Sequence, residues 1–258
     1  MPESDLDLLI DAARSAGRVA TGFVGPDAAS WDKPGGAGPV TEADIAVNDM
    51  LEHRLRTARP EYGWLSEETE DSADRLSKDK VFIIDPIDGT RSFVEGSRTW
   101  AHALAIAHHG IVTAAAIYLP MRDKLYSAEA GQGAFLNGSP IQPTGAADLT
   151  GAQVLAARPN LAEHHWPRGV PKIDRAYRPS LAYRLALVAE GRFDAMLTLR
   201  DSWEWDIAAG DLILREAGAL CTDKTGAPLQ FNNPRPMLNG VISGGRKLHG
   251  RIMDALGY

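Results

Sequence analysis

The sequence predicts an α+β protein built from stacked layers of helices and sheets. Segments with the 3.6-residue periodicity of amphipathic helices are mixed with short apolar runs that are typical of buried strands. The two kinds do not alternate strictly, which favours stacked layers over a doubly wound parallel sheet. A chain of 258 residues can form one large domain or two packed halves. We expect one compact unit with halves 1–148 and 149–258, because no flexible linker or internal repeat separates them.

The N-terminal half is predicted to begin with two helices. Ser4 can cap the first, which has an apolar stripe over residues 6–20. The Gly-, Pro- and Ala-rich segment 22–39 is predicted to be a loop. Thr41 and Asp44 then form a variant capping box at the start of the second helix. The elements that follow are strands at 62–65, 81–84 and 124–128, a β-hairpin at 101–119 and an Asn-Gly turn at 137–138.

The C-terminal half is predicted to contain three helices and two strands. Residues 180–190 have a helical pattern, and so do residues 205–217, where Gly218 provides the stop. The remaining elements are strands at 193–199 and 241–243 and a last helix at 248–256.

Composition excludes several classes of function. The net charge of −7 and the pI of about 5.5 disfavour a nucleic-acid-binding surface. Cys221 is the only cysteine, which indicates a reducing compartment, and the acidic N-terminus is unlike a signal peptide. Residues 99–121 lack charged side chains, but histidines, a glycine and a proline interrupt them, so a hairpin is favoured over a membrane span. We therefore expect a cytoplasmic protein with neither nucleic acid nor membrane as partner.

The most informative motif is Asp85-Pro-Ile-Asp88-Gly-Thr90, which follows an apolar strand. Pro86 is expected to end the strand's ladder because proline has no N–H to donate. Two carboxylates this close repel each other unless a proton or cation lies between them, and Mg²⁺ prefers such oxygen ligands. The simpler alternative is an Asp-Pro turn in which Asp88 caps the following helix.

Three more acidic residues lie where predicted elements begin or end. Asp44 is on the first turn of a helix, Glu67 follows a short strand, and Asp206 opens a helix. Taken singly, Asp44 is explained by the capping box, Glu67 by a solvated charge run, and Asp206 by the helix dipole.

Together these residues resemble the inositol monophosphatase family of Mg²⁺-dependent, Li⁺-sensitive phosphatases. The motifs occur in the family's order and extend over most of the chain: Val40-Thr-Glu-Ala-Asp44, Leu65-Ser-Glu67-Glu68-Thr69, Asp85-Pro-Ile-Asp88-Gly-Thr90 and Trp205-Asp206-Ile-Ala-Ala-Gly210. The resemblance implies a layered αβαβα sandwich of the inositol monophosphatase and sugar phosphatase type, and a homodimer. It also implies two or three Mg²⁺ ions, with these ligands: Glu67, Asp85 and the Ile87 carbonyl for the first; Asp85, Asp88 and Asp206 for the second; Asp44 and Glu67 for a weaker third.

The resemblance also implies catalytic roles. Thr90, paired with Glu67, would orient and help deprotonate the attacking water, beside Asp44. The N–H groups of Gly89 and Thr90 would bind phosphate oxygens, as helix termini do. Lys33 stands where the family often carries a lysine near the third metal, and the alternative is a solvated loop lysine. No Ser-His or Cys-His nucleophile set is evident, so metal-activated water is favoured over a phospho-enzyme.

The substrate is less well defined than the chemistry. Inositol-specific members typically carry a glutamate shortly before the Trp-Asp motif, but here the slot is Thr198 or Leu199. Arg184 stands where members that cleave adenosine 3′,5′-bisphosphate tend to carry a lysine, and a second phosphate would favour a cation. The alternative for Arg184 is a helix-surface residue, and Tyr183 could stack on a base or pack in the core. Asp206 would also contact substrate.

The preferred hypothesis is therefore a 3′(2′),5′-bisphosphate nucleotidase. Inositol-1-phosphate, fructose-1,6-bisphosphate and histidinol-phosphate hydrolysis remain alternatives within the same class. An alternative of another class is a non-catalytic regulatory protein that acts through a partner such as the transcription machinery. The complete acidic set argues against it, because a pure binding module has no need of five metal-directed carboxylates.

Overall fold

A seven-stranded sheet is the main element of the N-terminal half of the computed structural model, which describes residues 3–23, 29–33 and 38–258. Its order follows the chain, β3-β4-β5-β6-β7-β8-β9; β3 pairs parallel to β4, and the later pairs are antiparallel. The strands are β3 (Gly63–Ser66), β4 (Lys80–Asp88), β5 (Ala101–His108), β6 (Ile111–Leu119), β7 (Lys124–Glu129), β8 (Ala134–Leu136) and β9 (Ser139–Pro140). The predicted 101–119 hairpin is β5 and β6.

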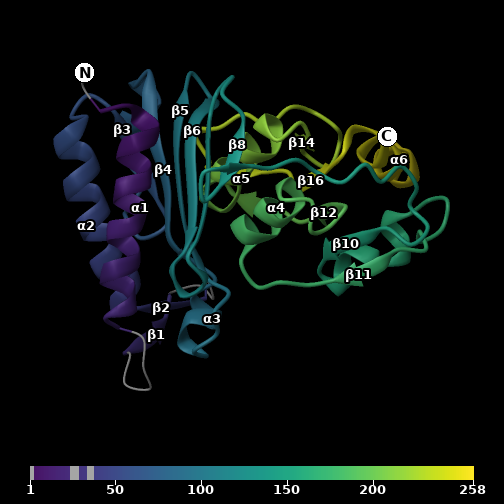
Figure 1. Ribbon diagram of the computed structural model, residues 1–258, viewed down its shortest axis with the longest axis horizontal. Coiled ribbons are helices and arrows are strands. Elements are labelled where there is room, and N and C mark those ends of the chain that lie inside the picture. The colour runs from purple at the N-terminus through teal and green to yellow at the C-terminus, as the bar shows by residue number, and fades with distance from the viewer. Residues whose placement is uncertain (1–2, 24–28, 34–37) are drawn as a thin grey trace.

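Helices α1 (Asp5–Thr21) and α2 (Glu42–Ala58) cover one face of this sheet (Figure 1). Both begin as predicted: the Ser4 hydroxyl accepts the Asp7 N–H at 3.0 Å, and α2 opens with a capping box. The buried faces of the two helices pack in one apolar core with Phe82 and Ile84 of β4.

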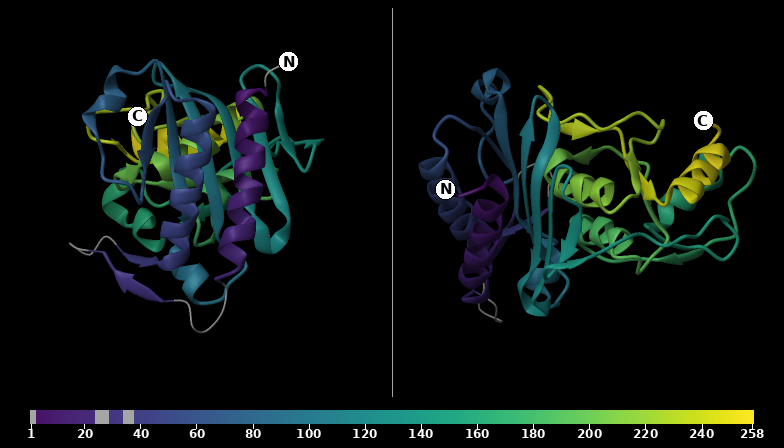
Figure 2. Two further views of the ribbon diagram at one scale, coloured as in Figure 1. Left: turned by 90° about the vertical axis from the view of Figure 1, so that its left-hand side faces the viewer. Right: turned by 45° about the horizontal axis from the view of Figure 1, so that its top comes forward.

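Helices α4 (Leu181–Ala189) and α5 (Glu204–Glu216) fill the space between the first sheet and a second one (Figure 2). The second sheet has the order β11-β10-β12-β16-β14. Its strands are β10 (Gln153–Ala156), β11 (Asp174–Ala176), β12 (Ala195–Thr198), β14 (Leu220–Thr222) and β16 (Val241–Gly244). Val81 and Ile83 of β4 and the odd-numbered residues of β5 pack with α4 and α5 in a core separate from the one under α1 and α2.

The outer face of the second sheet is covered by α6 (Arg246–Leu256), whose Leu248 and Ile252 pack with Val154 and Leu197. The layers are thus helix, sheet, helix, sheet and helix, which confirms the predicted αβαβα sandwich. Short elements complete the described chain: β1 (Ser30–Asp32), β2 (Pro39–Thr41), α3 (Thr90–Val94), β13 (Ser202–Trp203), β15 (Met237–Leu238) and 3-10 turns at Ala73–Ser77, Pro120–Arg122, Arg158–Leu161 and Glu163–His165.

Two sequence predictions need correction. The segment 22–39 is not all loop: β1 lies within it and pairs antiparallel with β2, while residues 24–28 and 34–37 lie outside the described chain. Pro86 does not end its strand. β4 continues to Asp88 through a shift in register between Asp85 and Asp88, and a proline is tolerated at such a bulge because its missing N–H is not needed in the ladder. None of the helices within the described residues is long and apolar enough to cross a membrane.

Candidate active site

Three carboxylates meet at the end of β4. Asp85 and Asp88 come from the strand, and Asp206 reaches them from the first turn of α5 on the opposite side of the interlayer space. One carboxylate oxygen of each residue lies within 4.8 Å of those of the other two. The Oδ1 atom of Asp85 is buried and has no hydrogen-bond donor among the described residues. An orphaned buried carboxylate oxygen indicates that a proton or a cation belongs there.

Electrostatics lead to the same conclusion. Burial, followed by the charges of Glu67 and Asp88, raises the pKa of Asp85 well above its ordinary value. Burial and the Asp88 charge do the same to the pKa of Asp206. Carboxylates that resist ionisation beside each other are relieved by a divalent cation, and all-oxygen donors suit Mg²⁺. The residues present therefore fit a magnesium site.

Asp88 is held by a helix other than the one that follows it. Its carboxylate accepts the Ser180 hydroxyl at 2.6 Å and the N–H groups of Leu181 and Ala182 at 3.1 and 2.6 Å. These donors are the N-terminus of α4, where a negative charge is favoured. The simpler reading of the motif, in which Asp88 caps its own following helix, is therefore wrong: α3 starts at Gly89 without a side-chain cap.

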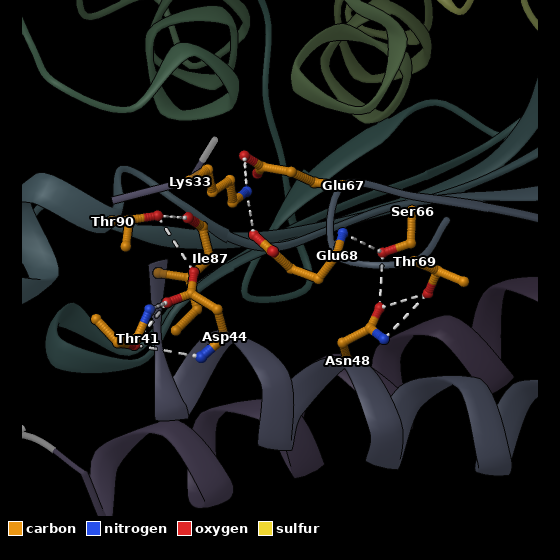
Figure 3. A network of polar contacts seen from close by, with 10 residues as sticks. All are labelled: Lys33, Thr41, Asp44, Asn48, Ser66, Glu67, Glu68, Thr69, Ile87 and Thr90. Carbon is orange, nitrogen blue, oxygen red and sulfur yellow. Dashed lines mark hydrogen bonds and ion pairs between the residues drawn. The ribbon is translucent and has the colours of Figure 1, made fainter. Parts of the chain in front are cut away.

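Asp44 joins the α2 capping box to the site. Its Oδ2 accepts the Thr41 N–H at 2.8 Å, and its Oδ1 accepts the Thr90 hydroxyl at 3.2 Å (Figure 3). The Thr90 proton is shared with the Ile87 carbonyl at 3.1 Å, since one hydroxyl has one proton. The predicted pairing of Thr90 with Glu67 is thus replaced by a pairing with Asp44. Burial raises the pKa of Asp44, which makes it a better proton acceptor.

Glu67 is drawn instead to Lys33. The ammonium group lies 2.8 Å from Glu67 Oε1 and 2.6 Å from Glu68 Oε1 (Figure 3). Both simpler readings, a solvated lysine and a solvated charge run, are wrong, because the Lys33 and Glu67 side chains are only 16% and 23% exposed. Burial and the neighbouring Glu67 charge raise the pKa of Glu68 to about 7.

The loop that carries Glu67 is anchored to α2 through Asn48. The Asn48 amide accepts the Ser66 hydroxyl at 2.7 Å and donates to the Thr69 hydroxyl at 3.1 Å (Figure 3). Trp64 donates its indole N–H to the same Thr69 oxygen at 3.1 Å. The position of Glu67 is therefore fixed on both sides along the chain.

Gly89 connects the strand to α3. It has φ +97°, a left-handed conformation that favours glycine. A Cβ there would lie 3.5 Å from the Ser180 Cβ and from the Thr99 carbonyl oxygen, so backbone conformation rather than space requires glycine. The turn brings Thr90 back over the Ile87 carbonyl, beside Asp44.

A cavity of about 350 Å³ lies near the carboxylates, because Arg184 in its lining bonds the Ser180 carbonyl and the Ser180 hydroxyl bonds Asp88. Its lining includes Thr198 and Leu199, the slot where an inositol-specific glutamate was expected, and the two arginines Arg184 and Arg200. The positive charges of both arginines act to lower the pKa of Asp206, against the larger opposite effect of burial. No acidic residue lines the cavity within the described part of the chain.

Arg184 is 6% exposed and is not a helix-surface residue. Its guanidinium donates to the Ser180 and Pro179 carbonyls, both at 3.3 Å, and lies 5.1 Å from the centroid of the Tyr177 ring. No carboxylate among the described residues lies within salt-bridge distance of it. Tyr183 is buried and packs in the core between the sheets.

Three residues of the site were missed by sequence reasoning. Ser180 stands at the start of a predicted helix, and its hydroxyl bonds Asp88. Glu68 stands inside a quoted motif and shares Lys33 with Glu67. Arg200 lies between two predicted elements, where the sequence gives no sign of which cavity it lines.

Three clustered carboxylates that fit a divalent cation, a cationic cavity near them and an αβαβα sandwich are together typical of a metal-dependent phosphatase. The chain belongs to the inositol monophosphatase family, whose profile matches residues 1–257. An inositol-1-monophosphatase of Mesorhizobium japonicum is 31% identical over 97% of this chain and 95% of its own length.

Two further similarities agree with this assignment. Nus factor SuhB of Escherichia coli is 31% identical over 86% of this chain and 85% of its own length. The crystal structure of extragenic suppressor protein suhB from Bartonella henselae superposes with a TM-score of 0.83 at 30% identity, covering 97% of both chains. The whole fold, and not only the motifs, is thus that of the family.

Proposed function

We propose that this phosphatase is a Mg²⁺-dependent hydrolase of small phosphate monoesters that prefers a substrate with a second phosphate, such as adenosine 3′,5′-bisphosphate. One observation carries the preference: two arginines line the cavity, with no carboxylate opposite them in the described lining. A cationic cavity of this kind favours an anionic group over a polyol.

The metal ligands are proposed to be the carboxylates of Glu67, Asp85, Asp88 and Asp206 and the Ile87 carbonyl, with Asp44 near a weaker third ion. Bound Mg²⁺ would neutralise phosphate charge and lower the pKa of a coordinated water. Oxygen donors of this kind suit Mg²⁺, which also keeps waters and substrate phosphate oxygens as ligands.

The chain's own groups supply orientation and proton transfer. The Thr90 hydroxyl donates to Asp44 Oδ1, so that its oxygen lone pairs are free to accept a proton from the attacking water. The N–H groups of Gly89 and Thr90 are proposed to hold the phosphate oxygens. Lys33 balances the charge of Glu67 as the anionic substrate enters.

The second phosphate is proposed to lie on Arg184 and Arg200. Arg184 is preorganised, because carbonyl acceptors and the Tyr177 ring already fix its guanidinium. A charge-assisted hydrogen bond from it to phosphate would strengthen binding by about 1.5–3 kcal/mol, or roughly 10- to 100-fold.

The test compares two substrates that differ by one phosphate. With Mg²⁺ present, kcat/KM is measured for adenosine 3′,5′-bisphosphate, for adenosine 3′-monophosphate and for inositol-1-phosphate. The wild-type protein should prefer the bisphosphate, and Arg200→Ala and Arg184→Leu should erase most of that preference while leaving the monophosphate rate nearly unchanged. Arg251→Ala, exposed on α6, is the matched control. A dominant rate on inositol-1-phosphate would refute the preference.

Three further properties are proposed on the resemblance alone. Li⁺ should inhibit the Mg²⁺-dependent reaction, and sedimentation should show a homodimer. Fractionation of cells should place the protein in the cytoplasm. Uninhibited turnover in Li⁺ or a monomeric mass would contradict the first two.

A regulatory binding role is the second candidate, and the name "Nus factor" of several relatives favours it. It predicts a function that survives Asp206→Asn. Purified protein that releases no phosphate from any of these esters with Mg²⁺ would make it the leading proposal.

A further inference from the structure

The spacing of Asp85 and Asp88 conflicts with the period of a strand. Successive side chains of a strand point to opposite faces, so residues three apart should lie on opposite faces. Here both carboxylates lie with Asp206 on the α5 side, while Ile87 packs in the core under α1 and α2. Something between Asp85 and Asp88 changes the alternation by one residue.

A β-bulge makes that change. Asp85 pairs with Ala103 and Asp88 pairs with Ala101, so that two residues of β4 face a single residue of β5, His102. Such two-against-one pairings re-aim side chains and are common beside active sites. Without the bulge, only one of the two carboxylates could face Asp206.

His102 fastens the bulge from the opposite face. Its Nδ1 is hydrogen-bonded to the Pro86 carbonyl, the acceptor that the bulge removes from the regular ladder. Because a carbonyl only accepts, Nδ1 must carry the proton. Burial lowers the pKa of His102 to about 4, so the ring is neutral and Nε2, which has no partner among the described residues, is a bare acceptor.

The ring itself cannot shift. His102 is fully buried, and its ring packs edge-on against Trp100 at 5.5 Å between centroids. The N–H that holds Pro86 is therefore directed by packing as well as by the hydrogen bond.

We propose that His102 is a positioning residue for the metal site, which holds the β4 bulge so that Asp85 and Asp88 face the same side and the Ile87 carbonyl is displayed next to them. The inference rests on the proposed metal site and is independent of the substrate. Residues that orient ligands in this way typically contribute about 10- to 100-fold to metal affinity.

The test is calorimetric titration of metal-free protein with Mg²⁺. His102→Leu removes the N–H but keeps the bulk, and should raise the Mg²⁺ Kd by at least about tenfold. His102→Asn places an amide N–H near the position of Nδ1 and should restore most of the affinity, whereas His102→Gln, whose amide reaches past it, should not. His249→Leu is the matched control, because His249 is also buried but lies on α6 and bonds Thr222 of β14, in the second sheet.

Each result has one meaning. Folded His102→Leu with wild-type Mg²⁺ affinity would overturn the proposal, and so would equal affinities for His102→Asn and His102→Gln if His102→Leu does not fold. Wild-type protein that binds no Mg²⁺ would overturn the metal site itself. If the wild-type protein binds Mg²⁺ but hydrolyses none of the esters, the proposed function fails while the role of His102 stands.

Discussion

The two groups of acidic residues in the candidate active site differ in whether a positively charged side chain lies beside them. On one side Asp85, Asp88 and Asp206 face one another with no lysine or arginine within salt-bridge distance in the described chain, and Asp85 Oδ1 lacks any partner there. On the other side Lys33 lies within 2.8 Å of both Glu67 and Glu68. The described residues supply no cation within salt-bridge distance on the first side, whereas Lys33 supplies one on the second.

This difference indicates a division of labour. A site without an internal cation has the strongest demand for Mg²⁺, because unpaired buried carboxylates are costly. A side already neutralised by Lys33 gains less from an ion and agrees with the expectation of a weaker third metal. The predictions below test this asymmetry.

Removing one carboxylate from the cation-free side should have the largest effect. Asp206→Asn should lower kcat/KM by about 10³-fold, because the Mg²⁺ ion that it helps to hold is proposed to supply several kcal/mol to the transition state. Phosphate release and calorimetric Mg²⁺ titration measure the loss. Asp211→Asn is the control: it lies on the same helix, is buried, and pairs with Arg215 instead. Equal activity of both variants would contradict the assignment.

Removing the shared hydroxyl should have a smaller effect and spare the metal. Thr90→Val should reduce kcat by about 10²-fold, the usual contribution of a proton-transfer group, with Mg²⁺ affinity nearly unchanged. Thr90→Ser should keep most of the rate. If Mg²⁺ affinity falls as far as kcat, Thr90 acts through the Ile87 carbonyl rather than on water.

Removing the Lys33 ammonium group should leave both groups of carboxylates without a positively charged side chain. Lys33→Met leaves Glu67 and Glu68 without a positive partner, so Mg²⁺ should bind this side about tenfold more tightly, which corresponds to roughly 1.4 kcal/mol. Titration should then show an additional ion. Lys80→Met is the control, because Lys80 pairs with Asp5 at the start of β4, away from Glu67 and Glu68. Unchanged Mg²⁺ binding would show that Lys33 does not compete with metal.

The smallest expected effect is a pH dependence of stability. Glu68 has a pKa of about 7 when folded against an ordinary value of 4.5, so the folded state holds a proton that the unfolded state has lost between these values. Stability from this group is complete below pH 4.5 and is lost as the pH rises to about 7. The Tm of metal-free protein should therefore fall by a few degrees from pH 5 to 7.5, and by less in Glu68→Gln. A rise in Tm over this range would contradict it.

Much of the fold could be predicted because the start, end and type of many helices and strands depend on residues close together in the sequence. The Thr41–Asp44 capping box, the apolar run of β4 and the glycine after α5 depend only on neighbouring residues. The bulge at Pro86 could not be predicted, because it depends on how β4 registers against β5. The division at residue 148 stays a prediction, since α4 and α5 of the second half pack on the first sheet.

The site was predictable as a set of residues but not as a set of contacts. Asp85, Asp88 and Asp206 do meet, as the joint motifs implied. The partner of Thr90 and the burial of Arg184 were missed, because both depend on side-chain directions that spacing does not encode.

The hydrogen bonds from the N-terminus of α4 to Asp88 also make the carboxylate site depend on contact between the two halves of the chain. Asp88 belongs to the first 148 residues, whereas its three donors, and Asp206 beside it, belong to the remainder. If the polypeptide were split at that point, neither fragment would hold a complete ligand set, and cation binding would return only on reconstitution. A complete site therefore requires the two parts of the chain to be docked against each other.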